Sequence, residues 1–112
     1  MTTITQVQLV SPQQLGIVDA PLYTSPTSTT SKIGRAVFTN TTASAVTITA
    51  GITAGVALGA STTMISARTV APGETYVSPE LAGAVMPAGS QLHVYASAAA
   101  SITFTASGSI VQ

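Results

Sequence analysis

The chain has 112 residues, and its three basic and three acidic side chains give a formal net charge of zero. Charged residues make up 5% of the sequence, against about 25% in an average soluble domain. The chain has three cations, no basic run and few aromatic residues. This excludes nucleic-acid binding, because cations are needed to neutralise phosphates and aromatic side chains are needed to stack on bases. Cysteine is absent, so disulfides, thiolate metal sites and cysteine nucleophiles are excluded.

Because charged residues are so few, the surface of the protein must be largely uncharged. A free domain usually stays in solution by means of a charged surface of mixed sign, and a net charge near zero favours association. Either the surface is tiled with Thr, Ser, Gln and Ala, which water solvates, or it is covered by copies of the chain or by another protein. We favour the second explanation, because an uncharged, strand-rich chain with open sheet edges would aggregate.

We expect a single domain, in which residues 1–31 form a strand or arm followed by a polar loop and residues 32–112 form the core. Residues 2–10 alternate weakly, as in an edge strand or an arm laid on a neighbour, and Ser11-Pro12 is expected to break the run. This stretch lacks the basic region and long apolar core of a signal peptide. No apolar run approaches the roughly 20 residues of a membrane-spanning helix.

The next segment of the chain predicts a loop and two strands. Residues 24–31, TSPTSTTS, predict an exposed polar loop without a side chain large enough to fill a core. Residues 32–40 predict a central strand covered on both sides, with Ile33 and Val37 on one face and Ala36 and Phe38 on the other. Residues 40–44, NTTAS, predict a hairpin turn, because asparagine tolerates the left-handed conformation that turns need. Residues 46–52 would return as the second strand of that hairpin.

The segment that follows contains glycines at regular intervals. Residues 51–61, GITAGVALGAS, lack the Lys-Ser/Thr pair of a phosphate-binding loop and the acidic partner of a dinucleotide fingerprint, so they predict a mobile connection between strands. Residues 62–70 predict the next strand. We expect no nucleotide or other cofactor.

Turn chemistry divides the C-terminal part of the chain. Pro72-Gly73 and Pro87-Ala88-Gly89 predict turns between short strands, and Ser78-Pro79 marks an edge or a corner. The last strand is the clearest one, because the residues of one face alternate with Thr and Ser on the other: Ile102, Phe104, Ala106, Gly108 and Ile110. Residues 96–101, ASAAAS, have helix propensity but are long enough only to join two strands.

The candidate chemical groups are few, and we expect no catalytic residue and no metal site. His93 is the one histidine; it shares a strand face with Tyr95 and is expected to face solvent or an interface. A single histidine with three scattered carboxylates is a poor ligand set for a metal, and no G-x-S-x-G motif accompanies it. Glu74 beside Pro72-Gly73 is expected to be a turn residue with Arg68 as its cross-strand partner, and not a catalytic partner of Glu80.

Four stretches of the sequence resemble a pattern of small tailed-bacteriophage virion proteins. They are KIGRAVFTNTT (residues 32–42), TVAPGETYV (69–77), LAGAVMPAGSQL (81–92) and ITFTASG (102–108). The resemblance implies an all-β fold, an antiparallel, jelly-roll-like β-sandwich of about eight short strands. It also implies a protein that decorates or cements the capsid, or lies at the neck, tail or fibre. It transfers no functional residue, since such proteins act through their surfaces.

We therefore expect a non-enzymatic structural protein located in the virion, acting as a homo-oligomer, with a trimer favoured, on other virion proteins such as the major capsid protein. Nucleic acid and membranes are not expected as partners. The main alternative is a receptor- or carbohydrate-binding module, which would need Tyr23, Tyr76 and Tyr95 to converge in one pocket. A small hydrolase is disfavoured for the reasons given for His93.

Overall fold

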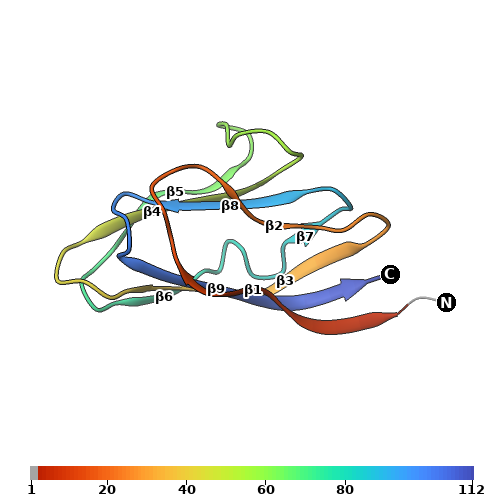
Figure 1. Cartoon of the computed structure of the whole chain (residues 1–112), viewed down its shortest axis with the longest axis horizontal. Helices are drawn as coiled ribbons and strands as arrows, with labels where there is room; N and C mark the ends of the chain where they lie inside the picture. Colours follow the sequence, from red (N-terminus) through yellow and green to blue (C-terminus); the bar gives the residue numbers. More distant parts are fainter. Residues whose placement is uncertain (1–2) are drawn as a thin grey trace.

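The computed structural model describes residues 3–112, which form two antiparallel sheets packed face to face (Figure 1). No residue in this range is helical. The strands are β1 (Ile4–Gln14), β2 (Pro21–Thr24), β3 (Thr30–Asn40), β4 (Val46–Thr53), β5 (Thr63–Val70), β6 (Thr75–Val77), β7 (Val85–Met86), β8 (Gln91–Ala96) and β9 (Ile102–Val111). The first and last described residues, Thr3 and Gln112, lie side by side at one end of the sandwich, where their backbones are hydrogen-bonded to each other.

The strand order is that of a jelly roll. The sheet at the bottom of Figure 1, here called the lower sheet, has the order β1-β9-β3-β6, with the short β7 also paired to β3. The upper sheet has the order β2-β8-β4-β5. Consecutive strands lie in opposite sheets except at β4–β5 and β6–β7, and the first strand pairs with the last, as in an eight-stranded jelly roll. The predicted all-β, jelly-roll-like sandwich is confirmed, with one additional short strand.

The predicted hairpin at residues 40–44 is wrong. β3 lies in the lower sheet and β4 in the upper sheet, so residues 41–45 form a corner that carries the chain from one layer to the other. The direct hairpin is the next one, because β4 pairs with β5. Strong alternation in two consecutive strands predicts one buried face for each strand. In a sandwich the two strands can belong to facing sheets, so that their buried faces pack against each other across the core and the strands are not paired in one sheet.

Asn40 explains why this corner forms. Its side chain is fully buried, and its Nδ2 donates to the carbonyl oxygens of Ser44, at 2.8 Å, and Val70, at 3.0 Å. Its Oδ1 accepts from the backbone N–H and the hydroxyl of Thr42, at 2.9 and 2.7 Å. One buried amide side chain thus bonds to backbone and hydroxyl groups of the corner and to the carbonyl oxygen at the end of β5.

The core lies between the two sheets. Phe38 of β3 and Phe104 of β9 are fully buried, with ring centroids 4.7 Å apart, and Tyr76 of β6 lies 6.1 Å from Phe38. From the upper sheet come the inward side chains of β4, β5 and β8, which include Ile48, Ile65, Leu92 and Val94. The predicted inward face of the last strand is confirmed from Ile102 to Ala106, where buried and half-buried residues alternate; from Ser107 on the residues are exposed or half-buried without alternation.

A β-bulge changes the predicted faces of β3. The register with β9 shifts between Ile33 and Arg35, at Gly34. The extra residue places Ile33 on the same inward face as Ala36 and Phe38, all of which are buried. The other face is only partly covered, because Lys32 and Arg35 are exposed and Val37 is half-buried. The prediction of a strand covered on both sides is therefore wrong.

Two N-terminal predictions also need correction. Pro12 does not end the first strand, since β1 continues to Gln14 with bulges on either side of Val10. β1 is an edge strand paired only with β9, and Pro12 lies in the irregular stretch between Val10 and Gln13, where a strand tolerates a residue without an N–H. Within the polar loop, Ser25, Thr29 and Ser31 are buried, and the Ser25 and Ser31 hydroxyls are 2.9 Å apart. Hydroxyl groups that bond to one another fill this corner instead of facing water.

Both proline-containing turns are confirmed. Glu74 N–H donates to Ala71 O and Gly73 has a φ of 73°, while Ser90 N–H donates to Pro87 O and Gly89 has a φ of 84°. Positive φ at the third position is the conformation for which glycine is favoured in type II turns.

We predict that Asn40→Ala lowers the free energy of unfolding by about 2 kcal/mol, because the carbonyl oxygens of Val70 and Ser44 lose their donor. Urea unfolding followed by circular dichroism measures the change. Thr41→Ala is the matched control, since Thr41 is exposed and its hydroxyl makes a single bond, to Ser101 O. Equal losses for the two variants would contradict the role assigned to the Asn40 side chain.

Candidate functional site

The outer face of the lower sheet is broad, and hydroxyl groups make up much of it. It consists of side chains that point away from the core on β3, β6, β7 and β9: Lys32, Arg35, Val37, Thr39, Thr75, Val77, Val85, Thr103, Thr105, Ser107 and Ser109. Val37 and Val77 are direct cross-strand neighbours, as are Thr39 and Thr75, whose hydroxyls lie 3.4 Å apart. The face has no large aromatic anchor.

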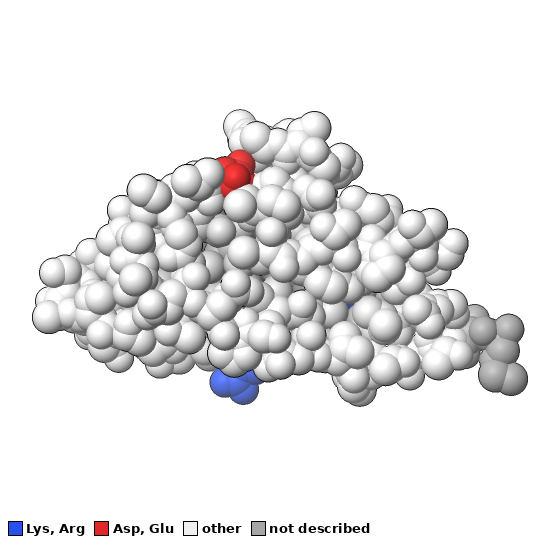
Figure 2. All heavy atoms as spheres, in the orientation of Figure 1, with Lys and Arg blue, Asp and Glu red and all other residues white. Residues whose placement is uncertain are grey.

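Charge is distributed unevenly over the fold. The strands of the lower sheet carry Lys32 and Arg35 and no acidic residue, whereas Asp19, Glu74 and Glu80 all lie in connections between strands. Figure 2 shows a face of the molecule on which charged atoms are confined to small, separate spots. Among residues 3–112, the exposed large apolar side chains are Ile4, Ile17, Val18, Val56, Met64, Val77 and Val85.

A shallow hollow lies where β1, β9 and the bulge of β3 meet. It is lined by Gln6, Val7, Gln8, Gly34, Ser107 and Gly108. None of these side chains titrates in the physiological range or acts as a nucleophile with a neighbouring base. The hollow therefore offers amide and backbone groups for contact but no set of residues for catalysis.

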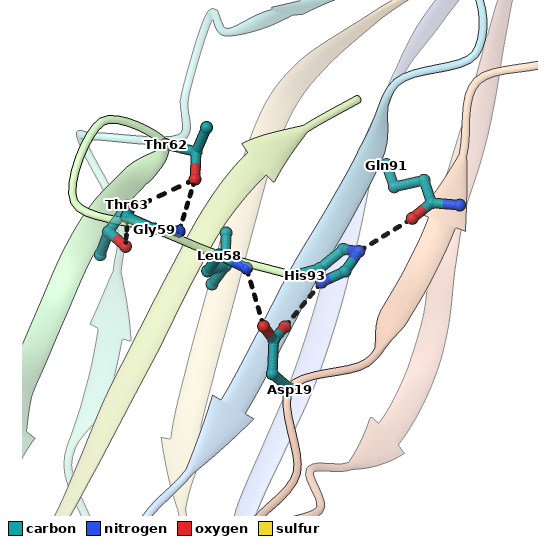
Figure 3. A network of polar contacts seen from close by, with 7 residues as sticks. All are labelled: Asp19, Leu58, Gly59, Thr62, Thr63, Gln91 and His93. Atoms are coloured by element: carbon teal, nitrogen blue, oxygen red, sulfur yellow. Dashed lines mark hydrogen bonds and ion pairs between the residues drawn. The ribbon is translucent and has the colours of Figure 1, made fainter. Parts of the chain in front are cut away.

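His93 is buried, in contrast to the prediction that it faces solvent or an interface. It does share the outer face of β8 with Tyr95, opposite the inward Leu92 and Val94, as predicted. However, two connections cover it (Figure 3). His93 Nδ1 lies 2.6 Å from Asp19 Oδ1, and the other oxygen of Asp19 accepts the backbone N–H of Leu58 at 2.8 Å. The segment before β2 and the β4–β5 loop thus meet above this part of the upper sheet.

Opposing effects act on the Asp19 carboxyl group. Burial by itself would raise the pKa of Asp19, but the hydrogen bond from Leu58 N–H and the hydrogen bond and charge of His93 together hold it below its ordinary value. Among residues 3–112, Asp19 and His93 are the one pair at ion-pair distance. The carboxylate is thus stabilised in its charged form at the place where two connections join.

A second polar cluster joins β5, β6 and the turn after β6. The Tyr76 hydroxyl donates to Glu80, Ser78 Oγ donates to Glu80 Oε1 at 3.1 Å, and the Arg68 guanidinium lies 4.0 Å from the centre of the Tyr76 ring. The hydrogen bond from Tyr76 lowers the pKa of Glu80, and burial together with this bond raises the pKa of Tyr76. This network links β5, an edge strand of the upper sheet, to β6, an edge strand of the lower sheet.

The two glutamates have different hydrogen-bond partners, and Arg68 has a different partner from the predicted one. Glu74 Oε1 accepts the Ala71 N–H at 2.7 Å, which confirms its role in the turn. Arg68 forms no ion pair with Glu74 and stacks on Tyr76 instead, since a guanidinium gains from the face of an aromatic ring.

The three tyrosines do not form one pocket. Tyr76 is buried in the lower sheet against Phe38. Tyr23 lies in the upper sheet, with its hydroxyl 2.7 Å from that of Ser31, and Tyr95 lies on the outer face of β8. The aromatic pocket required by the carbohydrate-binding alternative is therefore not present in this arrangement.

Within residues 3–112, no three side chains from His, Asp and Glu come together as metal ligands. The same range has no helix that is long and apolar enough to cross a membrane. The side-chain groups with titratable partners that lie together in this part of the chain are thus the Asp19–His93 pair and the Tyr76–Glu80 cluster.

Comparison with known proteins shows the fold. No protein-family model matches the sequence, and no curated protein is significantly similar to it. The structure of infectious bursal disease virus, Gx strain, matches with a TM-score of 0.56 and 17% identity, over 99% of this chain and 32% of that chain. The VP2 subviral particle of that virus matches with a TM-score of 0.56 and 18% identity, over 98% and 32%. The chain thus spans about a third of the length of these structural neighbours.

Acid should destabilise the fold through the two carboxyl groups whose pKa is lowered. Asp19 and Glu80 stabilise the folded state above their ordinary pKa values of 3.8 and 4.5, and this contribution is lost as the pH falls through their lower values in the folded state. We expect the urea midpoint to fall between about pH 5 and pH 2. The double variant Asp19→Asn with Glu80→Gln should show a flatter dependence, and an unchanged slope would contradict this explanation.

Proposed function

We propose that this chain is a non-enzymatic structural protein of a virion. The observation that carries the proposal is the jelly-roll strand order of this chain, whose structure matches about a third of the VP2 chain of a subviral particle with a TM-score of 0.56. The fold alone hosts many functions, so the second support comes from the surface. A face of threonine, serine and valine with two cations and no acid in its strands is suited to broad contact and offers no reaction centre.

The finer proposal is a decoration or cement protein of a bacteriophage capsid that works as a homo-oligomer, with a trimer favoured. Small side chains allow flat surfaces to approach closely, and symmetric repetition multiplies a modest contact over many copies. The major capsid protein is the expected partner. A place at the neck, tail or fibre is the alternative within the same class.

The test is the chain's presence in intact particles. We expect purified virions of the encoding virus to contain the chain in a fixed copy number by quantitative mass spectrometry. We also expect a cryo-electron microscopy map to show the two-sheet sandwich at symmetry-related positions on the head. If the density for the chain is confined to the neck, tail or fibre, the alternative position replaces the proposed role in capsid decoration. A chain that stays in the supernatant when particles are pelleted would contradict the proposal, and specific signal in a glycan-binding screen would favour the receptor-binding alternative.

A further inference from the structure

The β4–β5 loop (residues 54–62) folds back onto the outer face of the upper sheet. Gly51 of β4 lies directly opposite His93 of β8, and a Cβ atom on Gly51 would collide with the Thr62 carbonyl oxygen and with Leu58 Cδ2. The loop therefore packs on the sheet more closely than any side chain at position 51 would allow. In Figure 1 this loop rises above the upper sheet.

Asp19 connects three parts of the chain at this place. It belongs to the segment between β1 and β2, its Oδ1 contacts His93 of β8, and its Oδ2 accepts from Leu58 of the β4–β5 loop (Figure 3). The His93 side chain is 5% exposed and that of Asp19 is 24% exposed. Charge-assisted hydrogen bonds that are partly shielded from water are stronger than neutral ones. The carboxylate thus holds both connections against the sheet.

Both ring nitrogens of His93 face oxygen atoms. Nδ1 faces Asp19 Oδ1, and Nε2 lies 2.9 Å from Gln91 Oε1. An oxygen acceptor at each nitrogen is satisfied only by an imidazole that carries two protons. When the ring loses one proton, the Gln91 amide has to turn its NH₂ group toward Nε2, and the contact with Asp19 loses its positive partner.

We propose that Asp19 and His93 form a proton-controlled clamp, which holds the β4–β5 loop on the upper sheet when His93 is charged and loosens it when His93 is neutral. Gly51 of β4 and Pro21 of β2 oppose His93 in the sheet, the loop contributes Leu58, and none of these three residues has a titratable side chain; Tyr95 shares the outer face of β8 with His93. Histidine is the side chain that ordinarily changes charge between about pH 5 and pH 8.

The clamp fixes the position of exposed apolar side chains. Val56 of the loop is 64% exposed, and Ile17 and Val18, just before Asp19, are 58% and 70% exposed. A change in the charge of His93 therefore alters a surface as well as a buried contact. This inference rests on the geometry of the chain and stands apart from its proposed place in a virion.

Nuclear magnetic resonance of the intact chain tests the clamp. The ring nitrogen shifts of His93 report its charge, and hydrogen exchange of the Leu58 amide, corrected for the intrinsic pH dependence, reports the loop contact. We expect the protection of Leu58 to fall about tenfold as His93 loses its proton, because the His93–Asp19 contact that holds the carboxylate in place then loses its positive charge. The Thr41 amide, bonded to Ser101 O at 2.9 Å, is the internal control and should not change.

Asp19→Asn provides the matched variant, because asparagine keeps an oxygen acceptor for Leu58 N–H but has no charge. In this variant the protection of Leu58 should be low and independent of the charge of His93. The proposal is overturned if the wild-type Leu58 amide shows no step at the titration of His93. It is also overturned if Asp19→Asn shows the same step, or if the ring is neutral throughout the range from about pH 5 to pH 8.

Discussion

The apolar layer between the two sheets is the contact on which the rest of the structure depends. Fully burying a side chain such as Phe38 or Phe104 contributes about 1.5–3 kcal/mol, and the inward faces of both sheets supply such groups along their length. Because consecutive strands mostly alternate between the sheets, neither sheet forms without the other. The connections must then cross from layer to layer, and their buried polar groups need partners, which Asn40, Asp19 and Ser25 provide.

Much of the fold could be predicted from the sequence, since strand alternation and proline-glycine turns are local signals. The inward face of the last strand and the turn at Gly73 are examples. The pairing of strands could not be predicted in the same way. A buried face on β3 and another on β4 fit a hairpin and a sandwich corner equally well, and the buried Asn40 side chain decides between them. A bulge, such as the one at Gly34, leaves no signal in the alternation that precedes it.

The candidate site was harder to predict, because its residues are far apart in the chain. Asp19 and His93 are separated by 74 positions, and alternation correctly placed His93 on the outer face of β8. What covers that face is the β4–β5 loop, whose low-complexity sequence predicted only a mobile connection. Gly51 was the available signal, since a glycine in a strand often marks a close approach of another backbone. Glu74 was predictable because its partner is three residues away.

The central claim is that a jelly roll with so few charges persists because its outer surfaces are shared with other copies of the chain or with other proteins. An uncharged surface with long free edges, such as that of β1, is expected to pair or to associate. The most direct measurement is the mass of the purified protein in solution, by sedimentation velocity over a wide concentration range. The account predicts a discrete oligomer. A single subunit that stays monomeric and soluble at the highest concentration, and that attaches to no virus particle, would contradict it.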